Sequence, residues 1–151
     1  MSILDKVILF SSLSKEEKEK ILSIAEERRF KPEEKIFNEG DEGDGFYIIK
    51  SGKVRISIFL PDVGEELLSL LREGNHFGEM AIIEDKPRSA SAIADTETVC
   101  LYFNKEKFIS LMKEDTIMEN KILWEFIKEF SFRLRKTDKK LKEILLLIKT
   151  L

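Results

Sequence analysis

Short apolar runs separated by glycine-rich turns fill the chain from Phe30 to Phe103, and this alternation restricts the fold more than any other feature of the sequence. Residues 40–45 combine glycine with aspartate, two residue types that favour tight turns. Residues 54–58 alternate apolar and polar side chains, as a half-buried strand does. A further turn at residues 61–64 leads into a leucine-rich run over residues 67–71. The pattern predicts that this region is mainly β.

A helix is predicted before the strands. Ser14 and Glu17 have the spacing of a capping box, in which each side chain accepts a hydrogen bond from the other residue's backbone amide. The apolar side of this helix is formed by Leu13, Ile21, Leu22 and Ile24. We expect it to pack on the β region.

Two helices are predicted after the strands. Asn104 suits the first position of a short helix, and Thr116 with Glu119 has the spacing of a second capping box. This second box is expected to open the longest helix of the chain.

The longest helix carries an apolar seam with a heptad repeat, in alternating steps of four and three residues. Its members are Leu123, Ile127, Phe130, Leu134, Thr137, Leu141, Ile144, Ile148 and Leu151. A helix from residue 116 would be roughly 50 Å long at about 1.5 Å per residue, longer than a small β domain covers. A parallel homodimer through residues 116–151 and a helix folded back on its own domain are the two alternatives. Thr137 is the polar member of the seam, and it either fixes the register or contacts a ligand.

A candidate anion site lies between Gly78 and Arg88. Gly78 lets the backbone approach a bound group, and the residues after it can start a helical turn. Arg88 follows Pro87 and offers a planar fork of donors that suits a phosphate. Glu79 can accept hydrogen bonds from ligand hydroxyls or pair with the arginine. The alternative is that Gly78 serves only a turn and that Glu79 and Arg88 form a surface ion pair.

This segment resembles the phosphate-binding cassette of the cyclic-nucleotide-binding domain family, which includes catabolite activator proteins and protein kinase A regulatory subunits. The similar residues are Phe-Gly-Glu-Met-Ala at 77–81 and Pro-Arg-Ser-Ala at 87–90. Residues 36–54 follow the first strands and glycine turns of the family, and the resemblance covers about residues 8–142. It implies a mainly β fold with flanking helices. The expected architecture is a double-stranded β-helix (jelly-roll β-roll) with short N-terminal helices and a long C-terminal dimerisation helix.

The resemblance also implies the ligand and its contacts. Ser89 fits the cAMP-type pattern, and cGMP remains the alternative. The phosphate would be held by Arg88, Ser89 and the amides of Met80, Ala81 and Ala90, while Glu79, beside Gly78, would accept from the ribose 2′-hydroxyl. The base would lie against Ile56, Leu68 and Leu71. Residues 133–137 are similar to a family run whose threonine contacts the adenine amino group, so Thr137 is predicted to do the same.

One domain is expected over residues 1–151. Its parts are an N-terminal helical segment at 1–29, a β-roll at 30–103 with the cassette at 77–90, and C-terminal helices at 104–151. A chain of this length can bury a sizeable core, and its 42% hydrophobic and 36% charged residues are typical of a soluble protein.

The predicted function is a regulatory sensor of signal transduction, in which ligand binding moves the C-terminal helix of a homodimer. Members that regulate transcription carry a helix-turn-helix after this helix, for which residues 1–151 leave no room, so this chain alone is not expected to bind DNA. It would act on an unidentified effector protein or be the N-terminal fragment of a catabolite-activator-type regulator. A ligand-free structural dimerisation module is the remaining alternative.

The composition argues against an enzyme. A metal-dependent cupin needs clustered histidines, and His76 is the one histidine of the chain, expected in a partly exposed turn. A serine or cysteine hydrolase would need the same residue as its base, and Cys100 lies in an apolar run that indicates a core position. The net charge of −3 does not favour a nucleic-acid surface. No cofactor, metal, disulfide or membrane segment is predicted, and a cytoplasmic location is expected.

Overall fold

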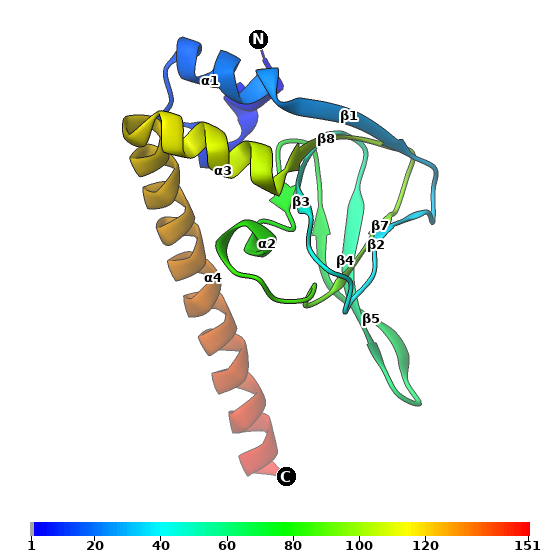
Figure 1. The fold of residues 1–151 in the computed structure, drawn as a ribbon. Coiled ribbons are helices and arrows are strands. Elements are labelled where there is room, and N and C mark those ends of the chain that lie inside the picture. Colours follow the sequence, from blue (N-terminus) through cyan, green and yellow to red (C-terminus); the bar gives the residue numbers. More distant parts are fainter. Residues whose placement is uncertain (1) are drawn as a thin grey trace.

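Two four-stranded antiparallel sheets form the centre of the structure (Figure 1). The computed structural model describes residues 2–151. One sheet has the order β1-β8-β3-β6, with β1 at Ala25–Phe30, β8 at Thr98–Asn104, β3 at Gly45–Ser51 and β6 at His76–Phe77. The other has the order β2-β7-β4-β5, with β2 at Lys35–Phe37, β7 at Ser91–Ala94, β4 at Val54–Leu60 and β5 at Gly64–Leu71. The predicted mainly β jelly roll with flanking helices is confirmed.

The first strand begins at Ala25, earlier than the predicted boundary at residue 30. It is an edge strand that pairs only with β8 within the described residues. Four of its six residues are charged, from Glu26 to Arg29, so it has no alternating apolar pattern. Charged side chains are common on edge strands because they discourage pairing with further chains.

Strands β3 and β8 are buried on both faces, which explains their nearly continuous apolar sequence. On one face Phe46 and Ile48 pack with Leu101 and Phe103 against the helices. On the other face the alternate residues pack between the two sheets, in a cluster of Tyr47, Ile49, Val54, Phe77, Ala92, Cys100 and Tyr102. The predicted core position of Cys100 is therefore confirmed.

The N-terminal helical segment packs on the first of these faces. It contains two 3-10 turns, η1 (Ile3–Lys6) and η2 (Ile8–Phe10), followed by α1 (Lys15–Ser23). The predicted capping box is present, because Ser14 Oγ accepts from the Glu17 amide at 3.2 Å and Glu17 Oε1 accepts from the Ser14 amide at 2.9 Å. Leu13 and Ile21 are buried in the core, as predicted.

The helices after the strands are α3 (Lys105–Glu114) and α4 (Thr116–Thr150). Asn104 caps α3 as predicted, since its side chain accepts from the Lys107 amide at 3.1 Å. The predicted cap of α4 is wrong by one residue. Asp115 accepts from the Met118 amide at 3.1 Å, and Thr116 is already helical. The ionised carboxylate of Asp115 takes the capping position, where negative charge is favoured.

Helix α4 has two halves with different surroundings. In the first half, Met118, Ile122 and Phe126 are buried against the N-terminal segment and α3. Residues 131–150 are exposed, and Figure 1 shows this part of α4 extending beyond the β-roll. The second half is thus not folded back on its own domain. Within residues 2–151, none of the helices has the length and apolar character that a membrane span requires.

Apart from Phe130, which packs against the core, the seam residues lie along a stripe of α4 that the domain leaves open. Exposed apolar side chains on this stripe are Leu123, Ile127, Leu134, Leu141, Ile144 and Ile148. They are therefore available to a partner helix.

Candidate functional site

Arg88 is the central side chain of the predicted cassette. It is 7% exposed, and its guanidinium lies over the Phe37 ring with 4.0 Å between Cζ and the ring centroid. Nη1 donates to the Gly78 carbonyl at 2.9 Å, and Nη2 donates to the Gly45 carbonyl at 2.8 Å. Asp44 Oδ1 lies 3.3 Å from Nη2. Arg88 therefore ties the cassette to the start of β3.

The Nε atom of Arg88 is buried and has no hydrogen-bond partner among the described residues. Leaving a buried donor without a partner costs free energy, and the cost is larger when the donor carries part of a positive charge. Burial lowers the pKa of Arg88, an effect that nearby Asp44 opposes. An anion placed against this arginine would relieve both effects.

Gly78 has a backbone conformation and an environment that only glycine tolerates. Its φ is +79°, and a Cβ atom there would lie 2.7 Å from Arg88 Nη1. Its carbonyl accepts from the Ala81 amide at 3.2 Å as well as from Arg88. The short helix α2 (Met80–Ile83) begins two residues later, which confirms the helical turn predicted after Gly78. Gly78 thus allows the turn and the arginine to pack together.

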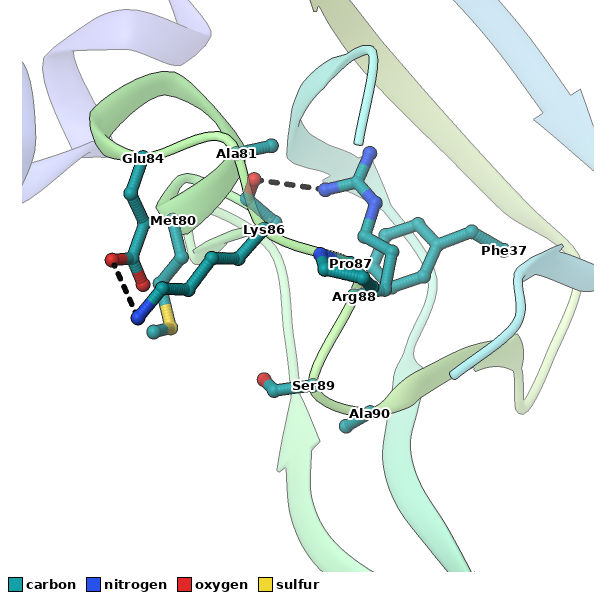
Figure 2. Close-up of a pocket in the computed structure, with 10 residues that line it drawn as sticks. Phe37, Met80, Ala81, Glu84, Lys86, Pro87, Arg88, Ser89 and Ala90 are labelled. Atoms are coloured by element: carbon teal, nitrogen blue, oxygen red, sulfur yellow. Dashed lines mark hydrogen bonds and ion pairs between the residues drawn. The ribbon is translucent and has the colours of Figure 1, made fainter. Parts of the chain in front are cut away.

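A small cavity of about 160 Å³ opens beside these residues, as Figure 2 shows. It is lined by Phe37, Gly78, Met80, Ala81, Glu84, Lys86, Pro87, Arg88, Ser89 and Ala90. Six of these residues were predicted as ligand contacts: Gly78, Met80, Ala81, Arg88, Ser89 and Ala90. Lys86 pairs with Glu84 at 3.6 Å in the lining, and Ser89 is exposed. A buried arginine, an exposed hydroxyl and a tight glycine turn are the groups that an anion-binding pocket uses.

Glu79 does not pair with Arg88, so the suggested surface ion pair between them is wrong. Glu79 is 2% exposed, and its Oε1 accepts from Arg133 Nη1 of α4 at 2.6 Å. Its Oε2 lies 3.6 Å from His76 Nδ1. Burial alone would raise the pKa of Glu79, but His76 and Arg133 outweigh it and lower the pKa to about 2. Glu79 is therefore ionised and can act only as an acceptor.

His76 is not the partly exposed turn residue that was expected. It is 6% exposed and lies in strand β6. Its Nε2 is 2.5 Å from Glu129 Oε2 on α4, and its ring meets the Phe126 ring edge-on at 6.1 Å between centroids. Burial alone would lower the pKa of His76, but the bond to Glu129 and the facing Glu79 raise it to about 9.

Five of the predicted contacts do not line the small cavity, and Glu79, described above, is one of them. Ile56 on β4 and Leu71 on β5 are partly buried against the core between the sheets. Leu68 on β5 is 52% exposed, and Thr137 lies in the exposed half of α4. Their contact with a base stays a prediction.

Sequence reasoning did not assign the roles of Phe37, Glu129 and Arg133. Phe37 supports the guanidinium of Arg88, while Glu129 and Arg133 bring charges from α4 to the cassette. The spacing of four between Glu129 and Arg133 was a usable signal, because it places an acid and a base on one helix face. It could not indicate which charges that face would meet.

Comparison with known proteins gives the family. The sequence profile described as "Cyclic nucleotide-binding domain" matches residues 27–115, more than half of the chain. The cAMP-dependent protein kinase regulatory subunit of Dictyostelium discoideum is 34% identical over 132 residues, which is 87% of this chain and 40% of that protein. The cGMP-dependent protein kinase of Toxoplasma gondii is 39% identical over 103 residues, 68% of this chain and 10% of that protein. The chain thus spans 40% of the length of the first of these relatives and 10% of the length of the second.

The fold comparison agrees. The crystal structure of the Thermus thermophilus catabolite activator protein superposes with a TM-score of 0.81 at 31% identity, covering 91% of this chain and 62% of that one. The N-terminal domain of a transcriptional regulator from Streptomyces coelicolor superposes with a TM-score of 0.79 at 25% identity, covering 93% and 95%. Both similarities include the flanking helices as well as the β-roll.

Proposed function

The chain belongs to the family of cyclic nucleotide-binding domains, and from this premise we propose that it is a sensor that binds cAMP in the cavity beside Arg88. The observation that carries the proposal is the buried guanidinium of Arg88, whose Nε has no partner in residues 2–151 and whose side chain lines the cavity. The cyclic phosphate is the anion that completes this site. The amides of Met80, Ala81 and Ala90 and the hydroxyl of Ser89 supply further donors. The Ala81 amide donates to the Gly78 carbonyl, so it would have to turn toward the phosphate.

The size of the cavity suggests how much of the ligand it holds. Binding sites for small molecules usually have volumes of about 300 Å³ or more. A volume of about 160 Å³ fits the phosphate and the ribose, so the base would extend past the cavity. Ile56, Leu68 and Leu71 on β4 and β5 are the apolar surface on which we place it. With about 22 non-hydrogen atoms and about 0.3 kcal/mol per atom, cAMP would bind with about 7 kcal/mol, near 10 μM.

The regulatory output is proposed to be a movement of α4 in a parallel homodimer. The exposed seam provides the dimer surface, and the ion pair between Glu79 and Arg133 links the cassette to this helix. If Thr137 contacts the base, ligand binding biases the position of both helices, because a ligand shifts an equilibrium only by binding its two states differently. An effector protein would respond to that position.

Calorimetry and thermal denaturation with cAMP, cGMP and the open-ring 5′-AMP test the ligand assignment. We expect cAMP to bind near 10 μM and to raise the melting temperature, with cGMP weaker and 5′-AMP much weaker. Ser89→Ala is the informative variant because Ser89 is exposed, so its loss should lower cAMP affinity several-fold without lowering the melting temperature of the free protein. Absence of any shift with both cyclic nucleotides would favour the ligand-free dimer module instead.

Spin-label distances between the two α4 helices test the output. We expect cAMP to change the distances across residues 131–150, and Thr137→Ala to weaken both the binding and this change. Distances that are the same with and without cAMP would contradict the proposed helix movement.

A further inference from the structure

Four charged side chains form a closed ring between the cassette and α4. Glu79 Oε1 is 2.6 Å from Arg133 Nη1, and Arg133 Nη2 is 2.8 Å from Glu129 Oε1. Glu129 Oε2 is 2.5 Å from His76 Nε2, and His76 Nδ1 is 3.6 Å from Glu79 Oε2. Acids and bases alternate around the ring. Two of its members come from the cassette side and two from the helix.

The proton on His76 decides whether this ring is balanced. Both imidazole nitrogens face carboxylates, and only the protonated form carries a donor on each. A neutral imidazole would turn a lone pair toward one carboxylate and leave Arg133 as the single cation between two acids. The charged groups that face His76 are Glu79 from the cassette and Glu129 from α4, while β3 faces it with the backbone of Ile48.

The link from His76 to Glu79 is the weakest of the four. At 3.6 Å it is too long for a hydrogen bond, and Nδ1 is buried without a partner among the described residues. Among the described residues, the recorded hydrogen bond to this carboxylate goes to Oε1, so Oε2 is the oxygen that we assign to a ribose hydroxyl. An imidazolium at this distance holds Oε2 by charge without occupying it.

A metal ion is a poorer occupant of this cluster than a proton. His76, Glu79 and Glu129 could each offer one ligand atom to a cation. However, the Arg133 guanidinium already lies between the two carboxylates and would repel a divalent ion. The two nitrogens of His76 also face different carboxylates, so the ring geometry suits an imidazolium bridge.

We propose that His76 is a positioning residue, whose imidazolium holds the Glu79 carboxylate in place for the ribose and fastens α4 to the cassette through Glu129. The proposal rests in part on the proposed function. Its first half concerns the ring in the free protein, and its second half concerns nucleotide affinity. In both halves, the attachment of α4 to the cassette depends on the proton of His76.

Titration of the imidazole by NMR tests the first half without any ligand. The chain has one histidine, so the signal needs no assignment by mutation. We expect the pKa of His76 to be close to 9, consistent with its two acidic neighbours, and Glu129→Gln to lower it by one pH unit or more. Glu143→Gln, on the exposed part of the same helix, should leave it unchanged. A pKa at or below 6.5 in the parent, or no change in Glu129→Gln, would overturn the ring.

Calorimetry with cAMP between pH 7 and pH 10 tests the second half. We expect affinity in the parent to fall at least fivefold as His76 loses its proton, with a midpoint that follows the NMR titration. In Glu129→Gln the midpoint should move to lower pH by the same amount, and in His76→Gln the fall should be absent. A cAMP affinity that stays constant while His76 loses its proton would refute the positioning role. No cAMP binding at any pH would refute the proposed function and the affinity half with it, whereas the NMR result would still decide the ring.

Discussion

Arg88 should stabilise the fold as well as bind the ligand, and Arg88→Ala measures both. The side chain donates at 2.9 and 2.8 Å to two backbone carbonyls, those of Gly78 and Gly45. Hydrogen bonds from a charged donor contribute about 1.5 kcal/mol each at the low end. The stacking on Phe37 adds about 1 kcal/mol. The partner carboxylate of Asp44 is 65% exposed and adds little. Arg88→Ala should therefore lower the free energy of unfolding by about 4 kcal/mol.

Urea denaturation of the free protein gives this value, and calorimetry gives the separate loss of affinity. We expect cAMP binding to weaken by about 2 to 5 kcal/mol, because the phosphate would lack its charged partner. Arg29→Ala is the matched control, since its side chain is 72% exposed and pairs only with Glu27 among the described residues. Its effect on stability should stay within about 0.5 kcal/mol. If Arg88→Ala changed the free energy of unfolding by less than 1 kcal/mol, the structural role assigned to the guanidinium would be wrong.

Three further outcomes are expected. Gly78→Ala and Gly40→Ala both place a side chain at positive φ, but only the former meets Arg88, so Gly78→Ala should cost at least about 1 kcal/mol more by urea denaturation; equal losses would contradict the close contact. The pKa of His76 is higher in the folded protein, at about 9, than its ordinary 6.5, so its stabilisation is complete below pH 6.5 and is lost as the pH rises through 9. The free energy of unfolding should fall by about 3 kcal/mol over this window, at about 1.4 kcal/mol per pH unit, and a flat profile would disprove the assignment. Leu134→Asp should convert the proposed dimer to a monomer in sedimentation experiments, while Lys139→Asp, outside the seam, should not; a parent protein that is monomeric at all concentrations would exclude the seam as an interface.

The sequence predicts features that depend on neighbours along the chain. The capping residues Ser14 and Asn104 were placed correctly because a cap acts within one helical turn. The cassette was found for the same reason, since Gly78 and Arg88 lie close together in a single segment. The error at Thr116 has a local cause as well, because Asp115 and Thr116 are both capping residues and the sequence did not rank them.

Contacts between distant segments account for most of what was missed. His76 was expected at the surface because its partner Glu129 is 53 residues away. The alternative that paired Glu79 with Arg88, its neighbour in the cassette, is wrong because the bonded partner of Glu79 is Arg133 on the distant helix α4. Charge spacing indicates that α4 has an acidic and basic face, but the meeting of that face with the cassette follows from the packing of the whole domain.

The shared core of the two ends of the chain has a consequence for biosynthesis. Leu4, Val7 and Phe10 are buried with Met118 and Phe126, so this earlier-synthesised segment completes its packing only after α4 has begun to emerge from the ribosome. Until then their apolar side chains remain open to chaperones or to other nascent chains. The β-roll lies between these ends and can collapse earlier. Synthesis of α4 would therefore close the domain and form its half of the charged ring in one step.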